Sequence, residues 1–355
     1  MRGRITALWA ALCLLLTGCG RMPYPREMED MALLRTMGVD REGGMLALTV
    51  STGPRARGLQ GDQEPALVLS AHGESLSAAA LSLQGLSDSY VFFGYVDQLL
   101  LGEELARENV RPVLDWFARD AELGLGARVW VVRWNAREAV ESGGDRGVDS
   151  HLTTLRADGE MGVASLSRTA GEVYGDLLEQ GTAYLPALTV SGQEAGALKD
   201  GGYAVLKDGT LMGYLEGDEA LGLELLAGRS SVHVLEERTG EGPVSLRVTA
   251  SSAAGRLTGE GRLSLTCRVS VHLEEYRHPL TASQLEDLQN RVKTREEGRV
   301  RAALDRLRDW KADCLGLGPR AGLTAPRVWS GLQVDWDRAF AALEPEVEVR
   351  VELHP

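Results

Sequence analysis

The sequence predicts a mixed α/β and α+β fold of three consecutive small sheet-plus-helix domains behind an N-terminal export segment. Strand and helix patterns alternate from about residue 30 to 147, a glycine-rich stretch at 142–147 interrupts them, and a long helical pattern at 281–315 lies among alternating strands. We therefore expect an N-terminal α/β domain at 30–147, a middle domain at 148–228 and a C-terminal α+β domain at 229–355. In the last domain the long helix should pack on a mainly antiparallel sheet.

Residues 1–18 have the pattern of a signal peptide. Arg2 and Arg4 precede an apolar run over residues 5–16, which is shorter than the about 20 residues that a membrane-spanning helix needs. The run ends in Leu-Thr-Gly-Cys, with small residues ahead of Cys19. This segment resembles the bacterial lipobox, in which the chain is cleaved between residues equivalent to Gly18 and Cys19 and the cysteine sulfur carries a diacylglycerol.

The lipobox resemblance predicts a lipid anchor on Cys19, with residues 19–29 as a tether between lipid and fold. Several acyl chains on one residue, as a diacylglycerol with an added N-acyl chain, give stable membrane attachment. No later apolar run is long enough to span a bilayer. We therefore expect an exported, lipid-anchored protein without any other cofactor. An ordinary secretory signal, in which Cys19 is incidental, is the alternative interpretation.

The chain is strongly acidic. Its formal charge is −13, and loss of Arg2 and Arg4 with the signal peptide lowers it to −15. Nucleic-acid binding depends on basic surfaces that displace counterions, and anionic lipid headgroups attract basic segments. The charge therefore argues against nucleic acid as a partner and against direct binding to anionic headgroups.

The elements of the N-terminal domain follow from apolar spacing. Alternating or continuous apolar runs predict strands at 46–52, 67–71, 90–101 and 127–134. Apolar residues at helical spacing predict a helix at 75–86. Glu103 and Glu104 should begin a second helix, where acids face the positive end of the helix dipole, and Pro112 should lie in the first turn of a third.

In the middle domain a helix is expected at 170–180, followed by strands at 184–190, 203–206 and 211–215 and a helix at 218–227. Asp208-Gly209 should make the hairpin turn between the last two strands, because this pair accepts positive φ angles. The C-terminal domain should contain strands at 232–235, 244–250, 263–273 and 347–353 around the long helix.

No pattern indicates catalysis or metal binding. The histidines stand far apart without zinc-type spacing, and GxSxG, P-loop and GxGxxG motifs in the required context are lacking. Glu103-Glu104 and Glu236-Glu237 could be paired catalytic carboxylates, but in an acidic chain such pairs are far more commonly solvated surface. Trp130 and Trp134 could line a pocket, although tryptophans are more commonly core residues. We therefore predict a protein that is not an enzyme.

Two cysteines, Cys267 and Cys314, remain outside the signal peptide and the lipobox. An exported protein can form a disulfide between them. Cys267 lies in an alternating strand pattern and Cys314 at the end of a helical pattern, so two buried thiols are the simpler interpretation.

Four segments in order resemble the Ger(x)C family, the lipoprotein C subunits of spore germinant receptors. They are residues 26–40, the stretch from Glu103 to Asp120, the hairpin at 202–215 with the glycines that follow it, and a C-terminal segment from Lys311 to Phe340. The resemblance spans the whole mature chain. Cys314 departs from it, because the family usually has an apolar residue there, and this favours a buried thiol.

The resemblance implies a non-enzymatic, lipid-anchored subunit on the outer face of the inner spore membrane, needed for the response to small nutrient germinants. Its partners would be two integral-membrane receptor subunits, an A-type subunit with a large soluble region and a B-type subunit that resembles an amino-acid transporter. We expect partner contacts in the 103–120 segment, with Arg107 and Arg119 as candidates, and in the C-terminal domain. Structural packing is the alternative role of that segment, and a substrate-binding lipoprotein of a transporter is the alternative function.

Overall fold

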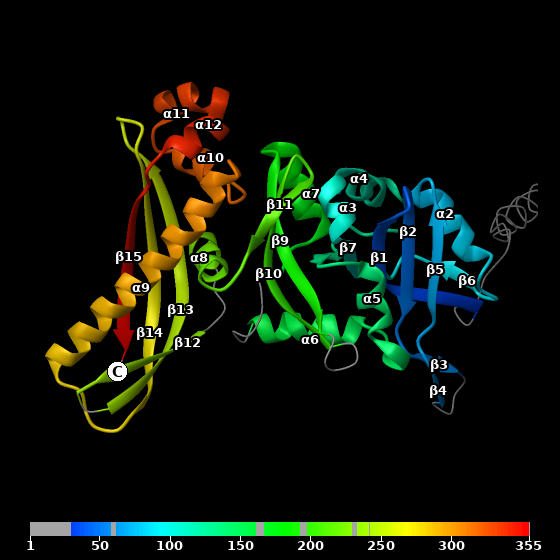
Figure 1. Cartoon of the computed structure of the whole chain (residues 1–355), viewed down its shortest axis with the longest axis horizontal. Coiled ribbons are helices and arrows are strands. Elements are labelled where there is room, and N and C mark those ends of the chain that lie inside the picture. The colour runs from blue at the N-terminus through cyan, green and yellow to red at the C-terminus, as the bar shows by residue number, and fades with distance from the viewer. Residues whose placement is uncertain are drawn as a thin grey trace, which may run out of the picture.

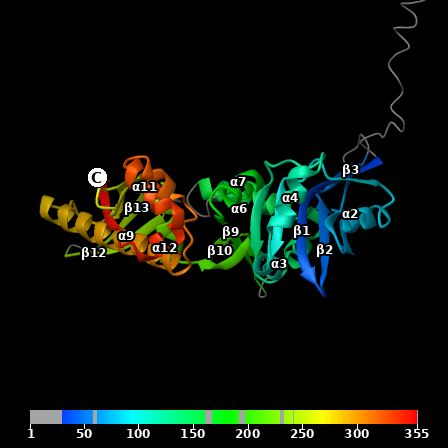
Figure 2. The ribbon, with the colours of Figure 1, turned by 90° about the horizontal axis from the view of Figure 1, so that it is seen from above.

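The chain folds into two bodies that lie side by side along its longest axis (Figure 1; Figure 2). The structure is a computed structural model that describes residues 30–57, 62–160, 167–191, 197–228, 233–240 and 242–354. Gly18, Cys19 and the predicted tether lie outside the described residues. No helix within the described part is long and apolar enough to cross a membrane.

The first body is built on a nine-stranded mixed sheet. Its strands run in the order β11-β10-β9-β8-β7-β1-β2-β5, and β6 pairs with the first part of β1. The central strands β9, β8, β7 and β1 are parallel, whereas the hairpin partners at both edges are antiparallel. The strands are β1 (Met31–Glu42), β2 (Met45–Thr52), β5 (Val68–Gly73), β6 (Tyr90–Phe92), β7 (Gln98–Gly102), β8 (Arg128–Val132), β9 (Thr182–Ser191), β10 (Ala197–Lys207) and β11 (Thr210–Leu215). A small separate hairpin joins β3 (Arg55–Arg57) to β4 (Asp62–Glu64).

Helices cover both faces of this sheet. One face carries α2 (Leu76–Gln84), α3 (Glu103–Glu108), α4 (Arg111–Arg119) and α7 (Ala170–Glu179), whose apolar residues share one core with the strands. The other face carries α5 (Ala136–Glu141) and α6 (Asp149–Glu160), with the short helix η2 (Gly144–Arg146) between them. Side chains at several helix starts accept backbone hydrogen bonds, as Thr169 does from Glu172 at the start of α7.

The second body is a four-stranded sheet crossed by the longest helix. Strands β12 (His233–Thr239), β13 (Gly242–Leu257) and β14 (Leu263–Tyr276) are antiparallel, and β15 (Glu346–His354) joins β14 in parallel. The apolar residues of the 28-residue helix α9 (Ala282–Asp309) recur at helical spacing and pack on one face of the sheet. This arrangement confirms the predicted mixed fold and its C-terminal helix-on-sheet unit.

A shared core joins the two bodies. Helix α8 (Asp218–Ala227), the end of α9 and the buried residues Tyr203 and Leu215 of the large sheet belong to one apolar cluster. Tyr203 donates its hydroxyl to Glu224 at 2.7 Å, and Thr182 donates to the Asp313 carbonyl at 3.1 Å. The helices α10 (Leu317–Gly322), α11 (Pro326–Leu332) and α12 (Trp336–Ala342), with η3 (Gln333–Asp335), cap one end of the second body.

One expectation needs correction. The strand expected at 90–101 is two strands, β6 and β7, because a turn at Phe93–Val96 separates them and the Phe93 amide donates to Glu122 instead of a neighbouring strand. The predicted boundary at 147/148 does not separate two sheets, because β8 and β9 from either side of it pair in parallel. Division into three domains therefore stays a prediction, while the observed sheets group the chain as 31–215 and 233–354.

Candidate functional site: an exposed tryptophan at the ends of the parallel strands

Trp134 is the most exposed aromatic side chain of the described residues, at 79 % of its full accessibility. It lies two residues after the end of β8, on the side of the sheet where the parallel strands β7 and β8 end. Its backbone has φ = 78°, a left-handed conformation that side chains of this size rarely adopt. Such a conformation costs about 1–3 kcal/mol and persists only where neighbouring groups hold it.

Glu103 holds the backbone of Trp134 in place. The Glu103 amide donates to the Trp134 carbonyl at 2.9 Å, and the Trp134 amide donates to Glu103 Oε2 at 3.2 Å. The other oxygen of this carboxylate, Oε1, accepts from Arg107 Nη2 at 2.6 Å and from Nε at 3.2 Å. One carboxylate therefore connects the strained turn to the first turn of α3 and to an exposed arginine.

Asp40 also stabilises this turn, through hydrogen bonds to the start of α5. Its buried carboxylate accepts from the amides of Ala136 at 2.7 Å and Arg137 at 2.9 Å, so that it caps the first turn of α5 immediately after Trp134. Burial raises the pKa of Asp40 to about 6, although the two amide bonds act in the opposite direction. A Cβ on Gly102 would lie 1.9 Å from Asp40 Oδ1, so that this close approach requires glycine.

Arg133 lies between Trp134 and the hairpin of β10 and β11 at the edge of the sheet. Its guanidinium lies 4.1 Å from the centre of the Tyr214 ring, and its Nη2 lies 2.6 Å from a carboxylate oxygen of Glu216. Trp134, Arg107 and Arg133 therefore surround the ends of β7 and β8, and we call these three residues and Glu103 the Trp134 surface. Exposed tryptophan and arginine side chains are the residue types that most commonly dominate protein interfaces.

The structure separates the two arginines that the sequence singled out. Arg107 belongs to the Trp134 surface, with its side chain 61 % exposed. Arg119 lies at the end of α4 and pairs with Asp115 at 3.0 Å, and Asp115 also accepts from the Tyr174 hydroxyl. Both arginines are solvent-exposed, but they take part in different local networks.

The other sequence candidates are structural. Trp130 is buried and donates its indole N–H to Gln98 at 2.9 Å. Of the acid pairs, Glu103 is described above, Glu236 accepts from the Ser245 hydroxyl, and Glu237 pairs with arginines of α9. Among the described residues, no three His, Cys, Asp or Glu side chains are arranged to hold a metal ion.

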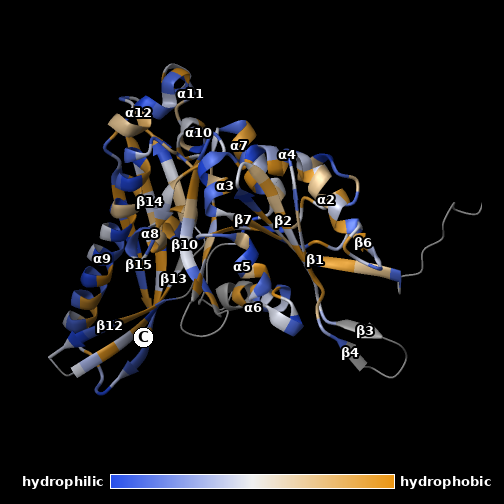
Figure 3. Ribbon diagram, turned by 45° about the vertical axis from the view of Figure 1, so that its right-hand side comes forward, coloured by the Kyte–Doolittle hydropathy of each residue, from blue (hydrophilic) through white to orange (hydrophobic). Residues whose placement is uncertain are grey.

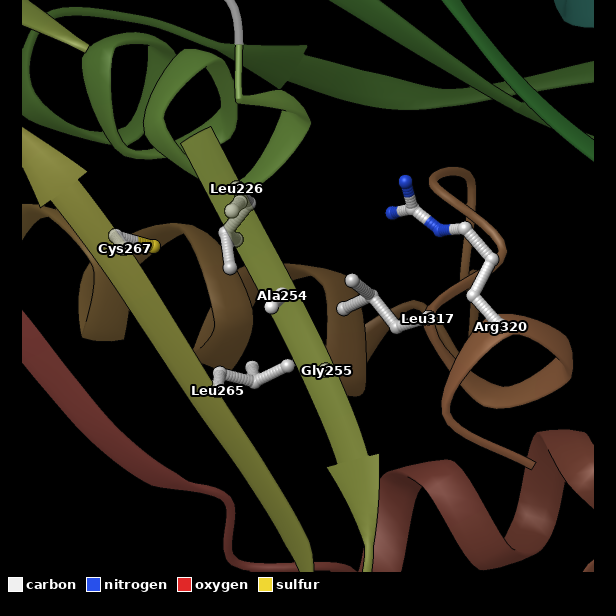
Figure 4. Close-up of a pocket in the computed structure, with 8 residues that line it drawn as sticks. Leu226, Ala254, Gly255, Leu265, Cys267, Leu317 and Arg320 are labelled. Atoms are coloured by element: carbon white, nitrogen blue, oxygen red, sulfur yellow. The ribbon is translucent and has the colours of Figure 1, made fainter. Parts of the chain in front are cut away.

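A small pocket between α8, β13, β14 and α10 has no catalytic arrangement. It measures about 170 Å³ and is lined by apolar side chains, among them Leu226 and Leu265, with the Cys267 thiol and the exposed Arg320 (Figure 4). Burial raises the pKa of Cys267 to about 12, so the thiol is neutral and a poor nucleophile at neutral pH. In the described structure Cys267 and Cys314 are both buried and unpaired, which agrees with the buried-thiol interpretation.

Two family profiles cover nearly all of the folded chain. The profile described as the spore germination protein N-terminal domain matches residues 25–190, and the profile described as spore germination B3/GerAC like, C-terminal, matches residues 201–354. The chain is a member of the Ger(x)C family. This confirms the resemblance drawn from the short sequence segments.

Individual relatives of this Ger(x)C protein agree with the profiles. Spore germination protein B3 of Bacillus subtilis (strain 168) is 23 % identical over 361 residues, covering 95 % of this chain and 94 % of the relative. The crystal structure of the GerBC protein superposes with a TM-score of 0.59 at 18 % identity, covering 94 % of this chain and 99 % of that one. The second likeness shows that the two chains share a fold.

Sequence reasoning named Trp134 only as a pocket-lining alternative and did not place it on an exposed surface. A signal was present: Arg133 and Trp134 alone separate the buried strand β8 from Asn135, whose side chain accepts from Glu138 and caps α5. A bulky side chain in so short a connection has little room to turn back into the core. Its left-handed backbone could not be read from the sequence.

Proposed function

We propose that this Ger(x)C protein is the lipid-anchored, non-catalytic C subunit of a nutrient germinant receptor. The match of both family profiles over 25–190 and 201–354 carries the proposal, because it extends over both bodies of the fold. The lipobox at Cys19 supports membrane attachment, and its partners would be the A-type and B-type integral-membrane subunits. On this account the protein acts at the outer face of the inner spore membrane.

The contact with a receptor subunit is assigned to the Trp134 surface. A large aromatic held at 79 % exposure contributes apolar area at little entropic cost, because its backbone is already fixed by Glu103. Arg107 stands beside it and can exchange or extend its ion pair with Glu103 when a partner binds. Lipid attachment would raise the local concentration of the subunit beside its partners, so that a modest interface is sufficient.

Co-purification tests this surface. Receptor subunits solubilised from spore membranes should be recovered with the wild-type protein, and Trp134→Ala should reduce their recovery by tenfold or more, which corresponds to about 1.4 kcal/mol. The matched control is Leu178→Ala, which removes another exposed apolar side chain, from α7 of the same body. Recovery with Trp134→Ala that equals the wild-type level would refute the assignment.

Membrane attachment is tested separately. Mass spectrometry of the N-terminal peptide should show a diacylglycerol on Cys19, and Cys19→Ala should move the protein from the membrane fraction to the soluble fraction. An unmodified Cys19 in membrane-bound protein would contradict the anchor.

A substrate-binding lipoprotein should have two similar lobes joined by hinge strands, whereas here a nine-stranded mixed sheet adjoins a four-stranded one.

A further inference from the structure

Helix α2 lies at the end of the molecule where the described chain begins. The carboxamide of Gln84, the last residue of α2, bonds to both the carbonyl and the amide of Val91 in β6. Strand β6 in turn pairs with β1 in the register Met31 to Tyr90. The last turn of α2 is therefore bonded to β6, and β6 lies beside β1, the first strand of the chain, as Figure 3 also shows.

The solvent face of α2 is uncharged in a chain whose formal charge is −13. No acidic or basic residue occurs from Ser75 to Ser87, while Glu74 and Asp88 stand on either side. Leu81 in α2 is 74 % exposed, and Leu86, just after the helix, is 56 % exposed. Tyr95, in the turn after β6, is another exposed side chain at 45 %.

The opposite face of α2 fixes the helix to the body of the protein. Leu76, Ala79 and Leu83 are buried, and the Ser75 hydroxyl caps the helix by accepting from Ala78. Trp116 of α4 donates its indole N–H to Ser77 at 3.0 Å. Leu81 is thus presented on a rigid helix, and Leu86 lies in the turn that follows its last residue.

We propose that the uncharged face of α2, with Leu81 and Leu86, rests on the surface of the lipid bilayer. This inference depends on the proposed anchor at Cys19. About ten tether residues separate Cys19 from the first described residue, and a fully extended chain of that length spans at most roughly 35 Å. The anchor therefore keeps the α2 end of the molecule close to the membrane at all times.

The bilayer is the occupant that fits these features. Apolar side chains insert into the headgroup boundary, and a face without acids avoids repulsion from anionic lipids, which the rest of this chain would experience. Because the anchor already supplies the attachment, the leucines need only to orient the protein and not to hold it there. This orientation would hold the other surfaces of the protein, including the Trp134 surface, in a fixed position relative to membrane partners.

Fluorescence quenching on vesicles tests this orientation with the full-length lipidated protein. An environment-sensitive fluorophore is attached at Ser82→Cys, beside Leu81, and in a second preparation at Ser330→Cys on α11. The two positions are matched, because both serines are exposed helical residues whose hydroxyls donate to backbone carbonyls at 2.9 Å. The remaining thiols, Cys267 and Cys314, are buried and should not be labelled.

The protein is reconstituted into phosphatidylethanolamine–phosphatidylglycerol vesicles that contain a doxyl-labelled lipid. We expect at least threefold stronger quenching at position 82 than at position 330. The double substitution Leu81→Glu with Leu86→Glu should bring position 82 to the level of position 330, while the protein still sediments with the vesicles.

Equal quenching at both positions in protein that sediments with vesicles overturns the proposal and leaves the anchor intact. Failure to sediment refutes the anchor at Cys19, and with it the orientation that depends on it. If the addition of receptor subunits shields position 82 from the doxyl lipid, this face contacts a protein partner. That result would also overturn the proposal.

Discussion

Asp40 should make the stability of the protein depend on pH in a way that one substitution removes. Its carboxylate is buried at the start of α5, and burial raises its pKa from 3.8 to about 6. A carboxyl group with a raised pKa binds a proton more readily in the folded than in the unfolded chain. It therefore stabilises the fold below about pH 4, and this contribution is lost as the pH rises through 6.

The size of the effect follows from the shift. A difference of about two pKa units corresponds to on the order of 3 kcal/mol between pH 4 and pH 7. Asp40→Asn cannot ionise, so its free energy of unfolding should lack this dependence. Asparagine also has a single acceptor oxygen for the two amides of α5, which should cost about 1–3 kcal/mol at pH 4.

Urea unfolding between pH 4 and pH 7 measures both quantities. Wild type should be more stable than Asp40→Asn by about 1–3 kcal/mol at pH 4. This advantage should fall by on the order of 3 kcal/mol by pH 7, so that the variant becomes as stable as wild type or more stable. Asp88→Asn, at an exposed acid, controls for the loss of one negative charge. A difference between wild type and Asp40→Asn that stays constant across this range would refute the assignment of Asp40 as a buried carboxylate with a raised pKa.

Three further predictions concern particular residues. Trp134→Gly should keep or raise the thermal midpoint, because glycine accepts φ = 78° without strain, yet it should weaken recovery of receptor subunits; a fall in the midpoint would contradict the strain at this turn. Cys267 and Cys314 should react with a thiol reagent only after unfolding, since both are buried and burial raises the pKa of each; rapid labelling of the native protein would show that the core is open. Leu304→Ala, in the buried face of α9, should cost about 2–5 kcal/mol of unfolding free energy in a chemical denaturation experiment, and a cost below 1 kcal/mol would mean that α9 is not closely packed there.

Elements with a strong local pattern were predictable from the sequence. The buried positions of α9 recur at helical spacing behind the cap at Thr281, and in β14 buried residues alternate with more accessible ones along most of the strand. The hairpin turn was also predictable, because Asp208 and Gly209 both take the positive φ angles that this turn requires.

Elements without such a pattern were missed. Strand β1 is an interior strand of the large sheet, but Arg35, Asp40 and Arg41 interrupt its apolar run. The buried Asp40 bonds to the start of α5, some 96 residues later in the chain. The single sheet across residues 31–215 depends on pairing between β8 and β9, and such long-range contacts leave no periodic signal. The lipid anchor at Cys19 stays a prediction from the sequence. The connection of Arg107 to Trp134 through Glu103 is visible only in the folded structure.

The most direct test of the account is germination of spores that lack this protein, with single nutrients as triggers and loss of refractility as the signal. The account predicts that these spores no longer respond to one class of nutrient but respond normally to a non-nutrient trigger, and that the wild-type gene restores the response whereas Cys19→Ala does not. Normal germination with every nutrient, in a strain that also lacks the paralogous C subunits, would contradict it.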